Sequence, residues 1–175
     1  MRGTLKIEFL FCLIATFVSG FFIFGASEVR AANVSSGADG NWSSPSTWAS
    51  TVRTGTITYV IDSPEIVGTG TAFLTELAVG SIITSASGRG NISVVVASIT
   101  DDTHLTVTTN AGLTSSGAKS FSSRNVPTAS DDVTIANGDA VVVDTDVSCA
   151  SLKFPTGNSA SSSLDINAGT LTVSG

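Results

Sequence analysis

Polar and apolar residues alternate along much of the chain, and this alternation predicts short β-strands separated by turns. Within residues 51–124, strands are expected at residues 56–61, 81–84, 92–99, 104–109 and 118–122. Only residues 71–78 have the spacing of a helical turn, with Phe73, Leu74 and Leu77 on one face. Turn-forming residues, including the Gly-Thr-Gly at 68–70, separate the strands. This region is therefore expected to form a small β-barrel or β-sandwich.

A second series of short strands follows, and no helix is predicted between them. These strands are expected at residues 133–135, 140–144, 151–154, 163–166 and 170–173, and Gly, Asn, Asp or Pro ends each one. Such strands at short intervals are typical of a parallel β-helix, in which each coil adds a strand to the coil before it. A Greek-key sandwich uses similar strands and stays an alternative. No polar cap follows the last strand, so we expect the sequence to continue in a longer protein.

The first 31 residues have a different pattern, which predicts an export signal. Arg2 and Lys6 precede an apolar run at residues 9–26 that holds six of the nine Phe, and the small residue Ala31 ends the segment. This order is the secretory signal pattern, with cleavage expected after Ala31. A run of this length can also just span a bilayer, so an uncleaved anchor is the alternative. We expect a secreted or cell-surface protein.

Removing residues 1–31 changes the charge and composition of the chain. Five basic residues then stand against twelve acidic ones, a net charge of −7, in a sequence rich in Ser, Thr, Val and Ile. This composition is typical of strands and polar turns. The absence of a basic patch argues against nucleic acid and anionic membranes as partners. No Gly-rich phosphate loop precedes a helix, which argues against a nucleotide.

Histidine and cysteine offer little chemistry. Cys12 would leave with the signal, so Cys149 can form no intrachain disulfide and is expected to be a small buried hydrophobe. His104 follows Asp101 and Asp102, where a surface or turn role is expected. One His and one Cys exclude a zinc site. The sequence predicts no catalytic, cofactor-binding or metal-binding residues, and the protein is expected not to be an enzyme.

Acidic residues gather in the second half of the chain, where two interpretations stay open. They are Asp131, Asp132, Asp139, Asp144 and Asp146. Calcium prefers several oxygen ligands, but the cluster lacks the spacing of known calcium loops. Carboxylates at strand ends that accept hydrogen bonds from turns explain the pattern equally well.

Two segments carry a resemblance to a known class of protein. The segments GNWSSPSTW at 40–48 and VPTASDDVTIANGDAVVVD at 126–144 together resemble the opening of large bacterial surface and secreted proteins built as right-handed β-helices. They also resemble the glycine-rich extracellular domain of some hyaluronan-related proteins. The first resemblance implies that Trp42 and Trp48 seal the end of the solenoid and pack near Val133 and Ile135. A sugar-stacking platform is the alternative role for the two Trp.

The two resembling segments are interrupted, which predicts a discontinuous domain. Residues 68–109 are similar to a small β module of phage tail and bacterial surface proteins. We therefore expect a signal peptide at 1–31, the cap and first coils of a right-handed parallel β-helix at 32–50 and 125–175, and an inserted β domain at 51–124. The ends of the insertion, near Ser50 and Arg124, should lie close together.

The resulting hypothesis is a non-catalytic, extracellular structural or adhesive surface protein, with a glycan or another cell-surface molecule as partner. One alternative is the targeting or capping end of a secreted polysaccharide-active enzyme. A carbohydrate-binding module is the other.

Overall fold

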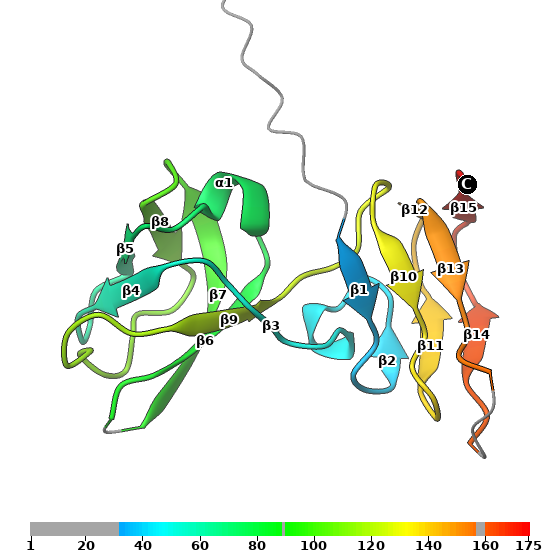
Figure 1. The fold of residues 1–175 in the computed structure, drawn as a ribbon, viewed down its shortest axis with the longest axis horizontal. Coiled ribbons are helices and arrows are strands. Elements are labelled where there is room, and N and C mark those ends of the chain that lie inside the picture. Colours follow the sequence, from blue (N-terminus) through cyan, green and yellow to red (C-terminus); the bar gives the residue numbers. More distant parts are fainter. Residues whose placement is uncertain (1–31, 89, 157–159) are drawn as a thin grey trace, which may run out of the picture.

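The computed structural model describes residues 32–88, 90–156 and 160–175, and they form two β units that lie side by side (Figure 1). The predicted signal segment lies outside the described residues. Among the described residues, helix is confined to one turn of α-helix, α1 (Phe73–Glu76), and a 3-10 turn, η1 (Pro45–Thr47). No helix in the described part of the chain has the length and apolar character needed to cross a membrane. The all-β expectation is confirmed.

One unit is a seven-stranded antiparallel sheet formed entirely by residues 51–124. Its strands are β3 (Thr51–Val52), β4 (Thr56–Tyr59), β5 (Glu65–Thr69), β6 (Ile82–Ala86), β7 (Asn91–Ile99), β8 (His104–Val107) and β9 (Phe121–Arg124). Their order across the sheet is β3-β9-β6-β7-β8-β5-β4. Two backbone hydrogen bonds between Ile57 and Lys119, of 2.8 and 2.9 Å, join edge strand β4 to the segment before β9. The sheet therefore curls back on itself.

Alternating residues of these strands fill a core of their own. Ile57, Ile66, Ile83 and Leu105 are buried there, and Phe73 of α1 meets Phe121 edge to face with ring centroids 5.9 Å apart. The predicted helical turn is thus present, and it contributes Phe73 to this core. One predicted turn is wrong in part: Gly68 belongs to β5, where it pairs with Ile57 of β4.

In the other unit, every pair of strands within the described residues is parallel. Its strands are β1 (Asn33–Ser35), β2 (Gly40–Asn41), β10 (Asp132–Thr134), β11 (Ala140–Val143), β12 (Val147–Cys149), β13 (Ser151–Lys153), β14 (Ser163–Ile166) and β15 (Leu171–Val173). They form three small sheets, β1-β10-β13, β2-β11-β14 and β12-β15. Apolar residues stack in register, as where Val34 pairs with Val133 and Val133 with Leu152. The chain therefore makes three passes through this unit, β1–β2, β10–β12 and β13–β15, and each pass lies on the one before it.

This arrangement corrects the solenoid expectation. The parallel sheets hold three, three and two strands, so no solenoid is shown and the sheets are not a parallel β-helix. The physical reason lies in the first pass, which supplies β1 and β2 but has η1 and Trp48 in place of a third strand. The third sheet consequently begins one pass later than the other two.

The two units are joined through neighbouring strands. Thr51 and Val52 of β3 pair with Ser123 and Ser122 of β9, so the chain reaches the seven-stranded unit and leaves it at one place. In Figure 1 both connections run from this sheet to the parallel strands. This pairing brings together the ends of segment 51–124, as the sequence predicts.

Candidate functional site

The two tryptophans come from the first stretch of the parallel unit and lie in its core. Trp42 and Trp48 are completely buried, and their rings meet edge to face with centroids 5.0 Å apart. The Nε1 of Trp48 donates a 2.9 Å hydrogen bond to the carbonyl oxygen of Trp42. The core they share includes Val133 and Ile135. The predicted packing is confirmed, and the alternative of a sugar-stacking platform is wrong for this pair, because neither ring face reaches solvent.

The acidic residues proposed as calcium ligands are used instead to hold one pass of the chain on the next. Each accepts a hydrogen bond from a different pass: Asp131 from Ala32, Asp139 from Ser36, Asp144 from Ser43, Asp132 from Ser151 and Asp146 from Thr170. The Ser43 hydroxyl, 2.5 Å from Asp144, holds the pKa of that carboxyl below its ordinary value. Within the described ranges, no group of three or more His, Cys, Asp or Glu side chains could hold a metal ion.

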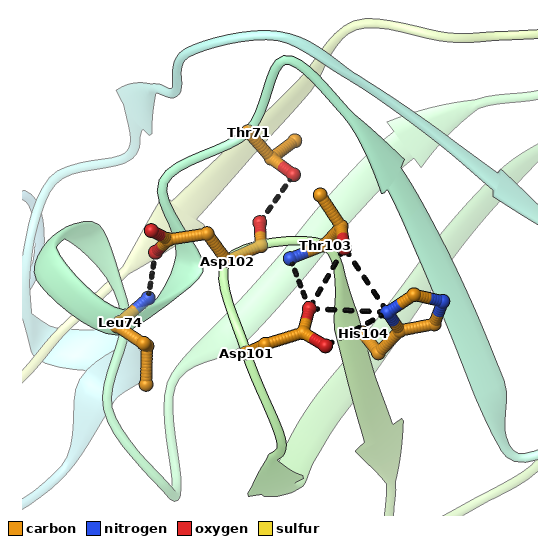
Figure 2. Close-up of polar contacts among 6 residues, drawn as sticks. All are labelled: Thr71, Leu74, Asp101, Asp102, Thr103 and His104. Carbon is orange, nitrogen blue, oxygen red and sulfur yellow. Dashed lines mark hydrogen bonds and ion pairs between the residues drawn. The ribbon is translucent and has the colours of Figure 1, made fainter.

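His104 is the first residue of β8 and follows the tight turn that joins β7 to β8. Figure 2 shows Asp101 directed toward Thr103 and His104, and Asp102 turned to the other side, toward Leu74. Asp101 Oδ1 accepts 2.7 Å hydrogen bonds from the backbone N–H and the hydroxyl of Thr103, and lies 3.0 Å from His104 Nδ1. An Asp–His contact can orient an imidazole for catalysis, but among the described residues no hydroxyl or thiol contacts its Nε2. The geometry fits the predicted turn role.

The opposite side of this turn holds α1 in place. The Asp102 carboxylate accepts a 2.9 Å hydrogen bond from the backbone N–H of Leu74, and the Asp102 carbonyl accepts a 2.5 Å hydrogen bond from the Thr71 hydroxyl. The β7–β8 turn thus anchors the start of the helix that delivers Phe73 to the core.

The carboxyl of Asp101 is expected to titrate well below an ordinary aspartate. Hydrogen bonds from the Thr103 hydroxyl, then from its backbone and from His104, lower the Asp101 pKa from 3.8 to about 2. Because the folded-state pKa is depressed, this stabilisation is present above about pH 4 and is lost as the pH falls through 2. Carboxyl NMR titration should give a midpoint near 2 in the parent and a higher one in Thr103→Val. A parent midpoint near 3.8 would contradict the geometry.

A cavity of about 200 Å³ lies where the two units meet. Its charged lining residues are Arg53, Glu76 and Asp131. The Nε of Arg53 donates a 2.7 Å hydrogen bond to the Ser123 hydroxyl, and burial lowers the Arg53 pKa while Glu76 and Asp131 oppose that shift. Arginine stays protonated at neutral pH all the same. The cavity therefore holds one fixed positive charge beside two carboxylates.

Further hydrogen bonds tie the units together around this cavity. The side-chain amide of Asn125 donates a 2.8 Å bond to the Glu76 carbonyl, and Arg124 Nη1 donates a 3.2 Å bond to the Ser46 carbonyl. This group of residues could not be predicted from the sequence, because Arg53 and Glu76 are isolated charges in polar stretches. The only available signal was the position of Arg53 beside the predicted boundary at residue 51.

Cys149 is completely buried in the core that contains both tryptophans, as predicted. Desolvation, and then the charge of Asp132, raises the pKa of its thiol. We expect a thiol reagent to modify Cys149 at least about 100-fold more slowly in the native processed chain than in urea, since opening such a core requires several kcal/mol. Equal rates in the two states would show that the thiol is accessible.

Comparison with family models, with curated proteins and with solved structures finds no match to this chain. The function must therefore be argued from the residues themselves.

Proposed function

We propose that the chain is a non-catalytic structural and adhesive region of an exported surface protein, in which stacked parallel passes carry the seven-stranded unit as an inserted, displayed domain. One observation carries this proposal: the acidic side chains that offered chemistry in the second half of the chain are engaged in holding successive passes together. The net charge of −7 after residue 31 and the signal-like pattern before it support an extracellular setting.

The finer form of the proposal is that the three passes begin a longer stack of the same kind. Val34, Val133 and Leu152 form one apolar column through the passes, and Val141 with Leu164 forms another. The buried Trp pair closes the first pass, where the third sheet has no strand. A stack that is closed at one end by large aromatic side chains can add passes only at the other end.

The adhesive part of the proposal is placed on the β4–β5 turn of the seven-stranded unit. Val60 and Ile61, consecutive residues of this turn, are 57% and 51% exposed. The turn is held by hydrogen bonds from Asn110 to the Asp62 carbonyl, at 2.7 Å, and from Ile61 N–H to the Thr114 hydroxyl, at 2.9 Å. A rigid turn that presents apolar side chains loses little conformational entropy when it binds a partner.

Binding of the secreted, processed protein to glycan arrays and to cultured cells tests the proposal. We expect retention that falls about tenfold or more in the double variant Val60→Ser/Ile61→Ser. Val79→Ser is the matched control, because Val79 is 69% exposed on a different turn of the same unit. Equal retention of the parent and the double variant would refute this contact. Release of sugar fragments from any array glycan would favour the enzyme alternative.

A further inference from the structure

Ala32, the first residue that the structure describes, is fixed at both of its backbone polar atoms. Its nitrogen donates a 2.8 Å hydrogen bond to Oδ1 of Asp131, and its carbonyl oxygen accepts a 2.9 Å hydrogen bond from the backbone N–H of Asp132. Strand β1 begins one residue later and pairs with β10, so Ala32 continues that ladder. The position of the Ala32 nitrogen is therefore set by the fold.

Asp131 is a buried carboxylate, only 4% exposed. Its Oδ2 accepts hydrogen bonds from the backbone N–H and the hydroxyl of Thr128, at 2.7 and 2.9 Å. Among the described residues no Lys, Arg or His nitrogen lies within 4.0 Å of the Asp131 carboxylate. The ion pair that the described residues do form joins His104 and Asp101, in the other unit. A buried carboxylate without a close positive charge is costly, so this site favours a cation at the position of the Ala32 nitrogen.

We propose that the Asp131 carboxylate binds the α-ammonium group of Ala32 in the processed chain, as an ion pair. The inference rests on the proposed export and on cleavage of the Ala31–Ala32 bond. Hydrolysis of that bond consumes one water: the hydroxyl joins the Ala31 carbonyl, a hydrogen joins the Ala32 nitrogen, and the new amine takes a proton at neutral pH. The single N–H that contacts Asp131 in the precursor becomes an ammonium in the same place.

The junction cavity accommodates this new charge. Ala32 and Asp131 both line it, and so do Arg53 and Glu76. One positive and two negative side chains face the cavity, so an α-ammonium brings the local charge to zero. The lining of the cavity is mostly apolar but includes Glu76, Asn125 and Thr128. Its volume leaves room for water at the two ammonium hydrogens that do not contact Asp131. Removal of the leader would thereby strengthen the contact between Ala32 and Asp131. That contact stabilises the pairing of β1 with β10 and the junction between the units.

The pKa of the α-amino group tests the pairing. It should lie at least about one unit above the ordinary 7.7–8.0 in secreted protein whose N-terminus has been sequenced, measured by the pH dependence of amine labelling. In Asp131→Asn the value should return toward the ordinary range, because only Glu76 then opposes Arg53. Asp146→Asn is the matched control, since Asp146 also accepts a backbone hydrogen bond from another pass yet does not contact Ala32. An ordinary pKa in the parent would overturn the proposal.

A second variant avoids any change in Asp131. Secreted protein with one Gly added before Ala32 retains a charged N-terminus but moves it away from the carboxylate. We expect its melting temperature to fall by about 5–10 °C, and the same addition to have no further effect in Asp131→Asn. An unchanged melting temperature would overturn the proposal. A secreted chain that begins elsewhere would overturn it while export stands, and retention of residues 1–31 in membranes would refute both.

Discussion

Replacing either tryptophan by alanine should lower the free energy of unfolding by about 3–5 kcal/mol, the range for removing a large aromatic side chain from a close-packed core. Trp42 and Trp48 are completely buried and contact each other, and the same core contains Val133, Ile135 and Val141. An alanine at either position would leave a cavity that the stacked passes could close only by shifting against one another. Urea unfolding of each variant, followed by circular dichroism, measures the loss.

Phenylalanine variants separate packing from hydrogen bonding at the same two positions. Trp48 Nε1 donates to the Trp42 carbonyl, whereas no described residue accepts a hydrogen bond from the buried Nε1 of Trp42. Trp48→Phe removes a satisfied donor and leaves a buried carbonyl with less hydrogen bonding; Trp42→Phe removes a donor that has no partner. We therefore expect Trp48→Phe to be the more destabilising by about 1–2 kcal/mol. The opposite order would contradict the hydrogen-bond pattern around the pair.

Because both rings are buried, substituting them should change the stability of the protein and leave its binding of glycans unchanged. A tryptophan exposed for sugar stacking would cost little stability when removed and would abolish glycan binding. Here we expect the reverse, with lowered unfolding midpoints and glycan binding unaffected below the melting temperature. An unchanged midpoint together with lost binding would restore the platform interpretation.

The strongly alternating strands could be predicted from the sequence, and those that carry few apolar residues could not. Strand β7 (Asn91–Ile99) alternates over most of its length and was predicted within one residue. Strands β1 and β2 escaped prediction because they hold little apolar surface and become strands only by pairing with β10 and β11. Strand β5 was not predicted because Gly68 suggested a turn. In the structure Gly68 lies within the strand, against Thr71 and Phe73, which leave no room for a side chain at this position.

The polar contacts between passes show a similar limit. The sequence placed five aspartates close together along the chain, which left a shared cation as one interpretation. Their partners, such as Ser36 for Asp139 and Thr170 for Asp146, lie far away in sequence and are brought near only by stacking. Side chains that share a cluster in sequence thus serve separate junctions in the fold. The position of Ala32 against Asp131, 99 residues later, depends on the same stacking and could not be predicted from local pattern.

A single methyl group added at Gly55 should destabilise the seven-stranded unit. Gly55 has φ of +78°, a conformation that L-residues avoid, and a Cβ there would lie 2.5 Å from the Gly70 carbonyl oxygen and 2.6 Å from that of Thr69. These are backbone atoms at the end of β5, which pairs with both β4 and β8, so they cannot move without opening a ladder. We expect Gly55→Ala to cost about 3–5 kcal/mol, since backbone strain and overpacking each contribute about 1–3 kcal/mol.

Gly80→Ala is the matched control for this substitution. Gly80 lies in the same unit with φ of +92°, but a Cβ there meets nothing within 4 Å. It therefore has the conformational cost of about 1–2 kcal/mol without the clash, partly offset because alanine restricts the unfolded chain. A difference of about 2 kcal/mol or more between the two variants would measure the close approach of Gly55 to β5. Equal costs would show that β5 can move aside.

The same pair of variants tests whether the two units unfold separately. Both tryptophans of the sequence lie in the parallel unit. The single tyrosine of the sequence, Tyr59, lies in the seven-stranded unit. If segment 51–124 is an inserted domain with its own core, Gly55→Ala should lower the circular dichroism midpoint and leave the Trp fluorescence midpoint almost unchanged. Coincident shifts of both signals would instead show that the junction around Arg53 and Asn125 couples the units into one cooperative fold, because the strain introduced at Gly55 would then reach the Trp core.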